Sequence, residues 1–431
     1  MISLTENHVA PADLLSDVSE LRREVQLVVS AAPVFDVHTH LFPPEFDSLF
    51  LQGIDDLLNY HYLVAEFFRS SNITHAAFWK LTKTERADLV WQLMFLENTP
   101  LSESACGVIA ILQAFGLDPR SADLTEARAF FVSRDLCEHF DRVLQMANVS
   151  DVVMTNDPFS EKETAVWTNG RPQDPRFHAS LRLDRLVNEW PESLSSRALA
   201  DYPVHANLDD ASITGLRKFL DDWIVRMRPL YMGLSLPPDL KFPDDDVRDR
   251  LLREVVLPTA LNHNLPLSLM MGVRRGVNPL LRNAGDSLGR ADITVLERLC
   301  GENPEVRFLA TVLSRENQHE LCVAARKFNN LMPFGCWWFV NNPSIVSEIT
   351  RERLEMLGAS FIPQHSDACV LEHLISKWDQ SRRVIAAALC ERYEQLLQNG
   401  YAVAKTEIER DVKRMFGGNF RAWVGLDAAQ H

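Results

Sequence analysis

The chain opens with apolar residues that recur every three or four positions, and this spacing predicts an amphipathic helix over residues 12–30. A short apolar run at residues 34–38 follows a proline and ends in polar residues, which is typical of a buried parallel strand where it leaves a sheet. From residue 43 to about residue 149 the pattern is again almost wholly helical. This stretch is far too long for one strand-to-helix crossover, so we interpret it as a helical insertion after the first strand.

Strand-like runs and helical runs alternate after the insertion. Further strands are predicted over residues 151–155, 177–183, 230–236, 265–271, 306–312, 331–336 and 360–363. With the run at 34–38 they make eight strands, and helical patterns lie between most of them. This alternation predicts an α/β protein with a (β/α)8 TIM barrel. A doubly wound sheet is the alternative, but no GxGxxG turn supports a dinucleotide site.

The pattern divides the chain into four parts, because residues 380–416 are helical again. Residues 1–42 hold the N-terminal helix and the first barrel strand, and residues 43–149 form the helical insertion. Residues 150–379 form the rest of the barrel, and residues 380–431 form a C-terminal helical segment that we expect to pack on it.

Composition narrows the class of protein. The 431 residues are 46% hydrophobic and 24% charged, which is ordinary for a globular protein. A net charge of -15 argues against a nucleic-acid-binding face and against a basic membrane-binding patch. Seven cysteines without a CxxC pair, no signal peptide and no long apolar run predict a cytoplasmic protein with reduced thiols.

The first strand ends in a candidate metal site. His38 and His40 are two positions apart, so in a strand their imidazoles point the same way, and imidazoles are good ligands for a divalent metal such as zinc. Asp367, just after the last strand, faces the same mouth of a barrel and could complete the site or act as general base. Structural histidines and a helix N-cap are the alternatives. His365 either supports this site or is an ordinary loop residue.

Other polar side chains follow the predicted strands. Arg182 ends a strand, where its guanidinium needs a partner such as a substrate carboxylate or Asp184. Arg274 and Arg275 follow the fifth strand and could supply the local positive charge that the whole chain lacks.

Aromatic residues add a further set of candidates. Trp337 and Trp338 follow the seventh strand and either line the site or fill the core. His61 and Tyr62 open an amphipathic helix of the insertion and are unremarkable on composition alone.

Several long strings of residues resemble the uronate (glucuronate) isomerase family of the amidohydrolase superfamily. They run from about residue 33 to beyond residue 378: FDVHTHLFPPEF, IDDLLNYHYLVAEFFR, MMGVRRGVNPLLRNAGDS, LSRENQHEL, FGCWWFVNNPSI and LGASFIPQHSDACVLEHLISKW. The resemblance implies a distorted barrel and the interconversion of D-glucuronate with D-fructuronate and of D-galacturonate with D-tagaturonate. It also implies a small sugar acid as substrate and a possible homo-oligomer.

The resemblance also implies roles for individual residues. His38, His40 and Asp367 match the family's metal-binding positions, with zinc as the expected ion. His61 and Tyr62 match its substrate-contacting pair. The family's base is thought to be the tyrosine, helped by a neighbouring arginine. Arg182 matches a substrate-binding arginine, and Trp338 lines the pocket, next to Trp337.

One position departs from the family pattern. Where the family has Ser-Asp-Ala-Arg, this chain has Cys369 in place of the arginine that would support Tyr62. Without a cationic neighbour, a phenol with a pKa near 10 is a poor base at neutral pH. The alternative function is therefore a metal-dependent hydrolase, hydratase or decarboxylase that kept the metal site, with Asp367 moving the proton. Cys369 itself is a substrate-contacting candidate or a small thiol filling the vacated space.

Overall fold

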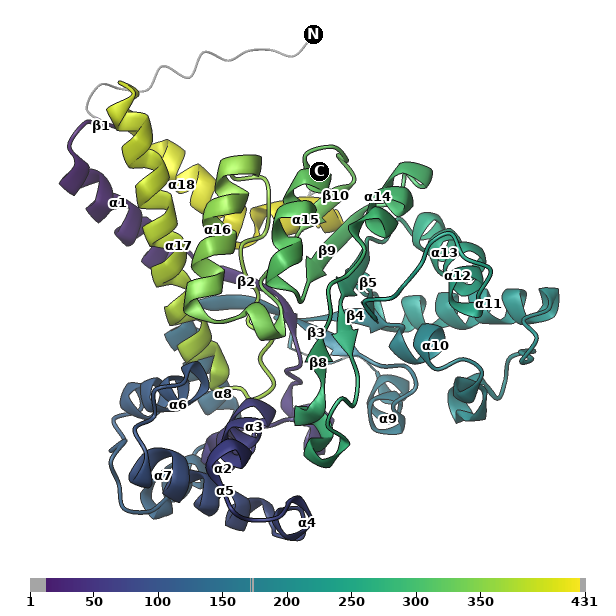
Figure 1. Ribbon diagram of the computed structural model, residues 1–431, viewed down its shortest axis with the longest axis horizontal. Helices are drawn as coiled ribbons and strands as arrows, with labels where there is room; N and C mark the ends of the chain where they lie inside the picture. Colours follow the sequence, from purple (N-terminus) through teal and green to yellow (C-terminus); the bar gives the residue numbers. More distant parts are fainter. Residues whose placement is uncertain (1–12, 171, 173, 427–431) are drawn as a thin grey trace.

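A curled parallel sheet lies at the centre of the molecule in the computed structural model, which describes residues 13–170, 172 and 174–426 (Figure 1). Its seven strands run in the order β10-β9-β6-β5-β4-β3-β2. They are β2 (Val34–Thr39), β3 (Val149–Asn156), β4 (Phe177–Arg182), β5 (Met232–Leu236), β6 (Leu267–Met271), β9 (Phe308–Val312) and β10 (Leu331–Pro333). Strands β2, β6 and β9 are buried along their whole length, as expected for parallel strands that are covered on both faces.

The eighth predicted strand, residues 360–363, is not a regular strand. A single parallel bridge joins Phe334 to Ile362 beside the β10 edge. Pro363 follows at once and has no N–H to donate, so the ladder cannot continue.

Residues after Pro363 reach the opposite edge of the sheet. The N–H of Asp367 donates to the carbonyl of His38 over 3.2 Å, and the N–H of His40 donates to the carbonyl of Ala368 over 2.8 Å. The segment from residue 360 to residue 368 therefore bridges the two sheet edges and completes a distorted (β/α)8 barrel, which confirms the predicted fold.

Helices follow most of the strands and cover the barrel. They are α9 (Glu161–Asn169), α10 (Asp184–Asn188), α11 (Asp210–Met227), α12 (Val247–Leu251), α13 (Leu257–Asn262), α14 (Ile293–Glu302), α15 (Gln318–Ala325) and α16 (Pro343–Leu357). A short antiparallel pair, β7 (Val273–Arg274) and β8 (Ser287–Leu288), carries the loop η7 (Pro279–Gly285) between its strands.

The chain between β2 and β3 is a helical insertion, as the sequence predicts. It contains α2 (Gly53–Leu58), α3 (His61–Ser70), α4 (His75–Phe78), α5 (Lys83–Trp91), η3 (Gln92–Glu97), α6 (Glu103–Ala114), α7 (Thr125–Val132) and α8 (Leu136–Ala147). Figure 1 shows α2 to α7 grouped at the lower left, beyond one end of the strands. Buried Glu372 ties the group to the barrel, because it binds Nε2 of His139 at 2.7 Å and accepts from the N–H of Gly53 at 3.1 Å.

The two ends of the described chain pack together. Helix α1 (Val18–Ala31) lies against α17 (His373–Gln398), and β1 (Leu14–Leu15) pairs with β11 (Val403–Ala404) in an antiparallel ladder (Figure 1). The C-terminal helical segment continues with α18 (Lys405–Lys413), η10 (Arg414–Gly418) and α19 (Asn419–Val424).

The predicted start of the first helix, residue 12, lies outside the described residues. The predicted helix is wrong at Leu14 and Leu15, which form β1 instead. Helix α1 begins only after Asp17, whose carboxylate caps it by accepting from the N–H of Glu20 over 2.8 Å. Within the described residues, none of the helices combines the length and the apolar character that a membrane span requires.

Candidate active site

His38, His40 and Asp367 come together at the carboxyl end of β2. Nε2 of each histidine lies 3.4 Å from Oδ1 of Asp367. One ligand atom from each of the three residues lies within 4.8 Å of the other two, so the cluster could hold a single metal ion. His38 and Asp367 are buried, whereas the side chain of His40 is 34% exposed and gives access to the site.

Two hydroxyl groups fix the tautomer of His38. Nδ1 of His38 lies 3.3 Å from the hydroxyl of Tyr231 and 3.5 Å from that of Thr155. Tyr231 donates its proton to the carbonyl of Val37, and Thr155 donates its own to the carbonyl of Thr39, both over 3.0 Å. Both hydroxyls therefore accept at Nδ1, so Nδ1 carries the proton and Nε2 keeps its lone pair for a metal.

The carboxylate of Asp36 positions the segment that carries Asp367. It accepts from the N–H of Ser366 over 3.0 Å and from Nε1 of Trp378 over 2.8 Å, and it is fully buried. Burial raises the pKa of Asp36 to about 6, against the lowering effect of these hydrogen bonds. Asp367 itself has a positive φ of 52°, a strained backbone for a residue with a side chain. Such strain is kept where neighbouring contacts determine the conformation, as those of Asp36 do here.

The electrostatics of the cluster suit a divalent cation. Burial acts to raise the pKa of Asp367, but the neighbouring imidazoles of His38 and His40 hold that pKa well below its usual range. Burial lowers the pKa of His40, which favours a neutral imidazole. Nε2 of His38 and Oδ1 of Asp367 are buried, and neither has a hydrogen-bond partner among the described residues. Two imidazoles and one carboxylate with free lone pairs are a donor set that zinc and similar metals accept.

A cavity of about 880 Å³ opens over the cluster. Most of the predicted site residues line it: His38, His40, His61, Arg182, Arg275, Trp337, Trp338, Asp367 and Cys369. Three predicted residues lie outside this lining, namely Tyr62, Arg274 and His365.

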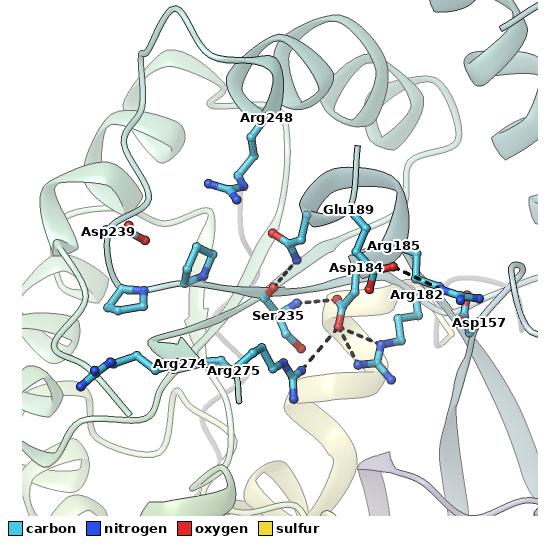
Figure 2. Close-up of a pocket in the computed structure, with 14 residues that line it drawn as sticks. Asp157, Arg182, Asp184, Arg185, Glu189, Ser235, Asp239, Arg248, Arg274 and Arg275 are labelled. Carbon is cyan, nitrogen blue, oxygen red and sulfur yellow. Dashed lines mark hydrogen bonds and ion pairs between the residues drawn. The ribbon is translucent and has the colours of Figure 1, made fainter. Parts of the chain in front are cut away.

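Each of these three has a defined place. Tyr62 packs against Tyr60, with ring centroids 4.9 Å apart, and its buried hydroxyl has no hydrogen-bond partner among the residues that the structure describes. His365 is fully buried edge-on to His38, at 5.0 Å between ring centroids. Arg274 faces a second cavity of about 840 Å³ (Figure 2).

Arg182 separates the two cavities and is already paired. Its Nε and Nη2 donate to Oδ2 of Asp184 over 2.9 and 2.6 Å (Figure 2). Of the two partners that the sequence offered for Arg182, a substrate carboxylate and Asp184, the structure therefore contains Asp184. The N–H of Ser235 holds the other oxygen of Asp184 at 2.7 Å. Arg275 approaches the same carboxylate at 4.0 Å and pairs more closely with Asp286, whereas Arg274 extends away from it (Figure 2).

The start of α3 contributes His61 to the wall of the cavity that contains the metal cluster. Burial lowers the pKa of His61 to about 4, so its imidazole is neutral at pH 7, and its Nε2 has no hydrogen-bond partner within the described chain. Burial raises the pKa of Tyr62 well above 10, and the charges of Asp367 and Glu103 add to the effect. Burial also raises the pKa of Cys369 to about 12. All three groups are therefore neutral at pH 7.

Sequence reasoning missed several residues of the site. Tyr60 lines the cavity, and Tyr231, the residue before β5, orients His38. Lys377 is buried, with Nζ 5.7 Å from the centroid of the Tyr62 ring and without a hydrogen-bond partner among the described residues. On α17 the positions three and four residues from Lys377 are mostly polar, so the sequence spacing gave no clear sign of a buried charge.

A parallel barrel with two histidines on its first strand and a carboxylate on the segment that closes it has the architecture of a metal-dependent barrel enzyme. The structure is similar to that of a uronate isomerase from Bacillus halodurans, with a TM-score of 0.94 and 48% sequence identity, covering 97% of this chain and 100% of the other. The chain belongs to the uronate isomerase family.

More distant structures share the fold. A uronate isomerase from Thermotoga maritima aligns with a TM-score of 0.75 at 15% identity, covering 94% of this chain and 97% of the other. A glucuronate isomerase from Caulobacter crescentus aligns with a TM-score of 0.74 at 17% identity, covering 96% of both chains. No protein-family model and no curated protein sequence matches the chain.

Proposed function

We propose that the protein is an aldose–ketose isomerase of hexuronates, which interconverts D-glucuronate with D-fructuronate and D-galacturonate with D-tagaturonate. The observation that carries this proposal is the similarity over the whole chain to the Bacillus halodurans uronate isomerase, at 48% identity. The cavity supports it, because a polar pocket of about 880 Å³ with a guanidinium at its edge has room and charge for a sugar acid.

His38, His40 and Asp367 would hold the metal ion, for which we propose zinc. The free lone pairs of His38 Nε2 and Asp367 Oδ1 support this assignment. When bound, such an ion supplies positive charge that polarises a carbonyl or carboxylate oxygen of the substrate.

The reaction moves a proton between C2 and C1 of the open-chain sugar through an ene-diol, so it needs a proton acceptor near carbon and a donor near oxygen. We assign the acceptor to His61, which is neutral and has an unpartnered nitrogen, or to the carboxylate of Asp367. Tyr62 remains a phenol because burial raises its pKa, so we assign it the donation of an O–H proton to the sugar oxygen. This role requires the side chain of Tyr62 to turn into the cavity, because it lies outside the cavity lining.

The remaining predicted residues would position the sugar acid. Arg182 is held by Asp184 at one side of the cavity and offers its outer N–H groups to a carboxylate. Trp337 and Trp338 form an apolar wall, and no described residue accepts a hydrogen bond from the buried Nε1 of Trp338, so it can donate to a sugar hydroxyl.

Cys369 is not suited to act as a nucleophile, whereas the metal-dependent alternative, in which Asp367 moves the proton, is decided by the turnover test below. A hydrolase that used this residue as nucleophile would need a thiolate, whereas burial raises the pKa of Cys369 to about 12. Cys369 lines the cavity as a small neutral side chain where the family pattern has an arginine.

The proposal also covers the cellular location of the protein and its self-association. We propose a cytoplasmic enzyme, since all seven cysteines lie in the described residues and carry free thiols. Self-association is a prediction from family habit that sedimentation of the purified protein would test.

The test is turnover of both hexuronates by purified, zinc-loaded protein, followed by chromatography of the sugar acids. Wild-type protein should convert each aldose to its ketose, and Asp367→Asn should lose this activity by at least about 100-fold. Asp379→Asn, which removes an exposed carboxylate of α17, is the matched control and should retain full activity. If neither sugar is converted, the proposal is wrong.

A further inference from the structure

Two arginines meet on a tryptophan at the mouth of the main cavity. Arg86 comes from α5, Trp79 follows α4, and Arg282 lies in η7. The guanidinium carbons of Arg86 and Arg282 lie 5.4 and 4.4 Å from the Trp79 ring centroid. Trp79 is itself fixed, because its Nε1 donates to the carbonyl of Leu280 over 2.8 Å. All three side chains line the cavity that contains the metal cluster.

The charges of these two arginines, the rim pair, are not neutralised. Among the described residues, neither guanidinium lies within 4.0 Å of a carboxylate oxygen, whereas Arg182 and Arg275 in the same cavity are both in ion pairs. Arg86 donates only to the amide oxygen of Asn59, over 2.9 Å. Burial and the charge of Arg282 both lower the pKa of Arg86, so the two cations repel one another.

Two carboxylates that also line this cavity form ion pairs with other cations. Asp56 forms an ion pair with Lys83 at 2.9 Å, and Asp286 pairs with Arg275. The mouth of the cavity is therefore locally positive in a protein whose net charge is -15.

The backbone gives an independent reason to assign a function to Arg282. Its φ of 54° and ψ of -125° lie in a region that suits glycine and is strained for any residue with a Cβ. The same loop does have glycine where space requires it, since a Cβ on Gly285 would lie 1.9 Å from the carbonyl oxygen of Asn278. An arginine kept at a strained position suggests that its side chain is needed there.

We propose that the rim pair, Arg86 and Arg282, binds the carboxylate of the incoming sugar acid and draws it into the cavity. Two guanidiniums stacked on one indole ring present their N–H groups in a fixed geometry, which suits a carboxylate. This inference rests on the proposed function for its ligand, because the ligand is the substrate of that reaction.

The experiment compares Arg282→Gly, Arg282→Gln and Arg86→Gln with wild type, using D-glucuronate in low salt and in 1 M NaCl. Each variant should lower kcat/KM in low salt by about five-fold, mainly through KM, as expected for a partly exposed charge pair. The loss should nearly vanish in 1 M NaCl, where the screening length is about 3 Å. Arg282→Gly alone should also raise the melting temperature, because it relieves the backbone strain. Arg69→Gln, an exposed arginine of α3 outside the cavity lining, is the matched control and should match wild type.

Calorimetric binding of D-glucuronate separates this inference from the proposed function. If wild type binds the sugar acid without turning it over, and the rim variants bind it more weakly, the proposed isomerisation is contradicted, whereas carboxylate binding by the rim pair is supported. If wild type turns it over and the variants keep wild-type kcat/KM in low salt, only the rim pair fails. The role of the rim pair is also contradicted if the variants lose the same factor of kcat/KM in low and in high salt, or if wild type does not bind D-glucuronate.

Discussion

Replacing Tyr231 by phenylalanine removes one hydroxyl from beside the imidazole of His38. That hydroxyl lies 3.3 Å from Nδ1 of His38 and donates to the carbonyl of Val37 over 3.0 Å. The ring stays in place, since Tyr231 is only 1% exposed and phenylalanine fills the same core space. The change therefore tests the hydrogen bonds and leaves the packing of the barrel alone.

Two effects of different size should follow. The carbonyl of Val37 loses its donor, and a buried group left unsatisfied costs about 1–3 kcal/mol of the free energy of unfolding. His38 keeps a weaker acceptor in Thr155 at 3.5 Å, so the tautomer is less well fixed but not lost. Loss of a group that orients a metal ligand lowers metal affinity about 10- to 100-fold, and the remaining Thr155 contact places the expected loss near 10-fold.

Zinc affinity should be measured by competition with a chromogenic chelator, and stability by urea unfolding of the metal-free protein. Tyr401→Phe is the matched control, because it removes a hydroxyl that is bonded only to Glu407 on the surface. An unchanged zinc Kd in Tyr231→Phe, with stability lowered, would refute the argument that Tyr231 sets the tautomer of His38.

Three further changes test neighbouring groups. Lys377→Met removes a buried ammonium that has no hydrogen-bond partner in the described part of the chain, so the free energy of unfolding should rise by about 1–3 kcal/mol. The kcat should fall, because Nζ of Lys377 lies 5.7 Å from the ring centroid of Tyr62, and loss of both stability and activity would mark Lys377 as structural. Cys369→Arg should raise hexuronate turnover by placing a cation near Tyr62, and unchanged turnover would contradict that argument. Burial raises the pKa of Glu163 to about 8, above its unfolded value of 4.5, so between these two pH values the folded state holds a proton that the unfolded state has lost. The melting temperature should therefore fall as the pH rises from 4.5 to 8, and this fall should be smaller in Glu163→Gln.

The barrel could be predicted because its strands carry local signals. Each strand is an apolar run between polar turns, and that pattern survives in the structure with ends shifted by a few residues. The eighth predicted strand, residues 360–363, differs because Pro363 and the positive φ of Asp367 prevent a regular ladder. Only the hydrogen bonds to the two edges of the sheet show that residues 360–368 still close the barrel. The first helix begins late because Leu14 and Leu15 pair with β11, a partner almost 390 positions away that no local pattern reveals.

The site was predictable to the same extent. His38 and His40 share a strand, so their common direction follows from the spacing of two, and the position of Asp367 follows from barrel topology. The roles of Tyr231 and Asp36 depend on which strand and helix ends meet, and local spacing carries no such information. The rim pair likewise joins helix α5 to a loop about 200 residues later.

The central claim is that this cavity isomerises hexuronates, and proton NMR of zinc-loaded protein with D-glucuronate tests it most directly. We expect the anomeric proton signals of D-glucuronate to decrease while the other ring-proton signals of D-fructuronate, a ketose without an anomeric proton, rise to a fixed ratio, which the reverse reaction from D-fructuronate also reaches. An unchanged spectrum for both D-glucuronate and D-galacturonate would contradict it.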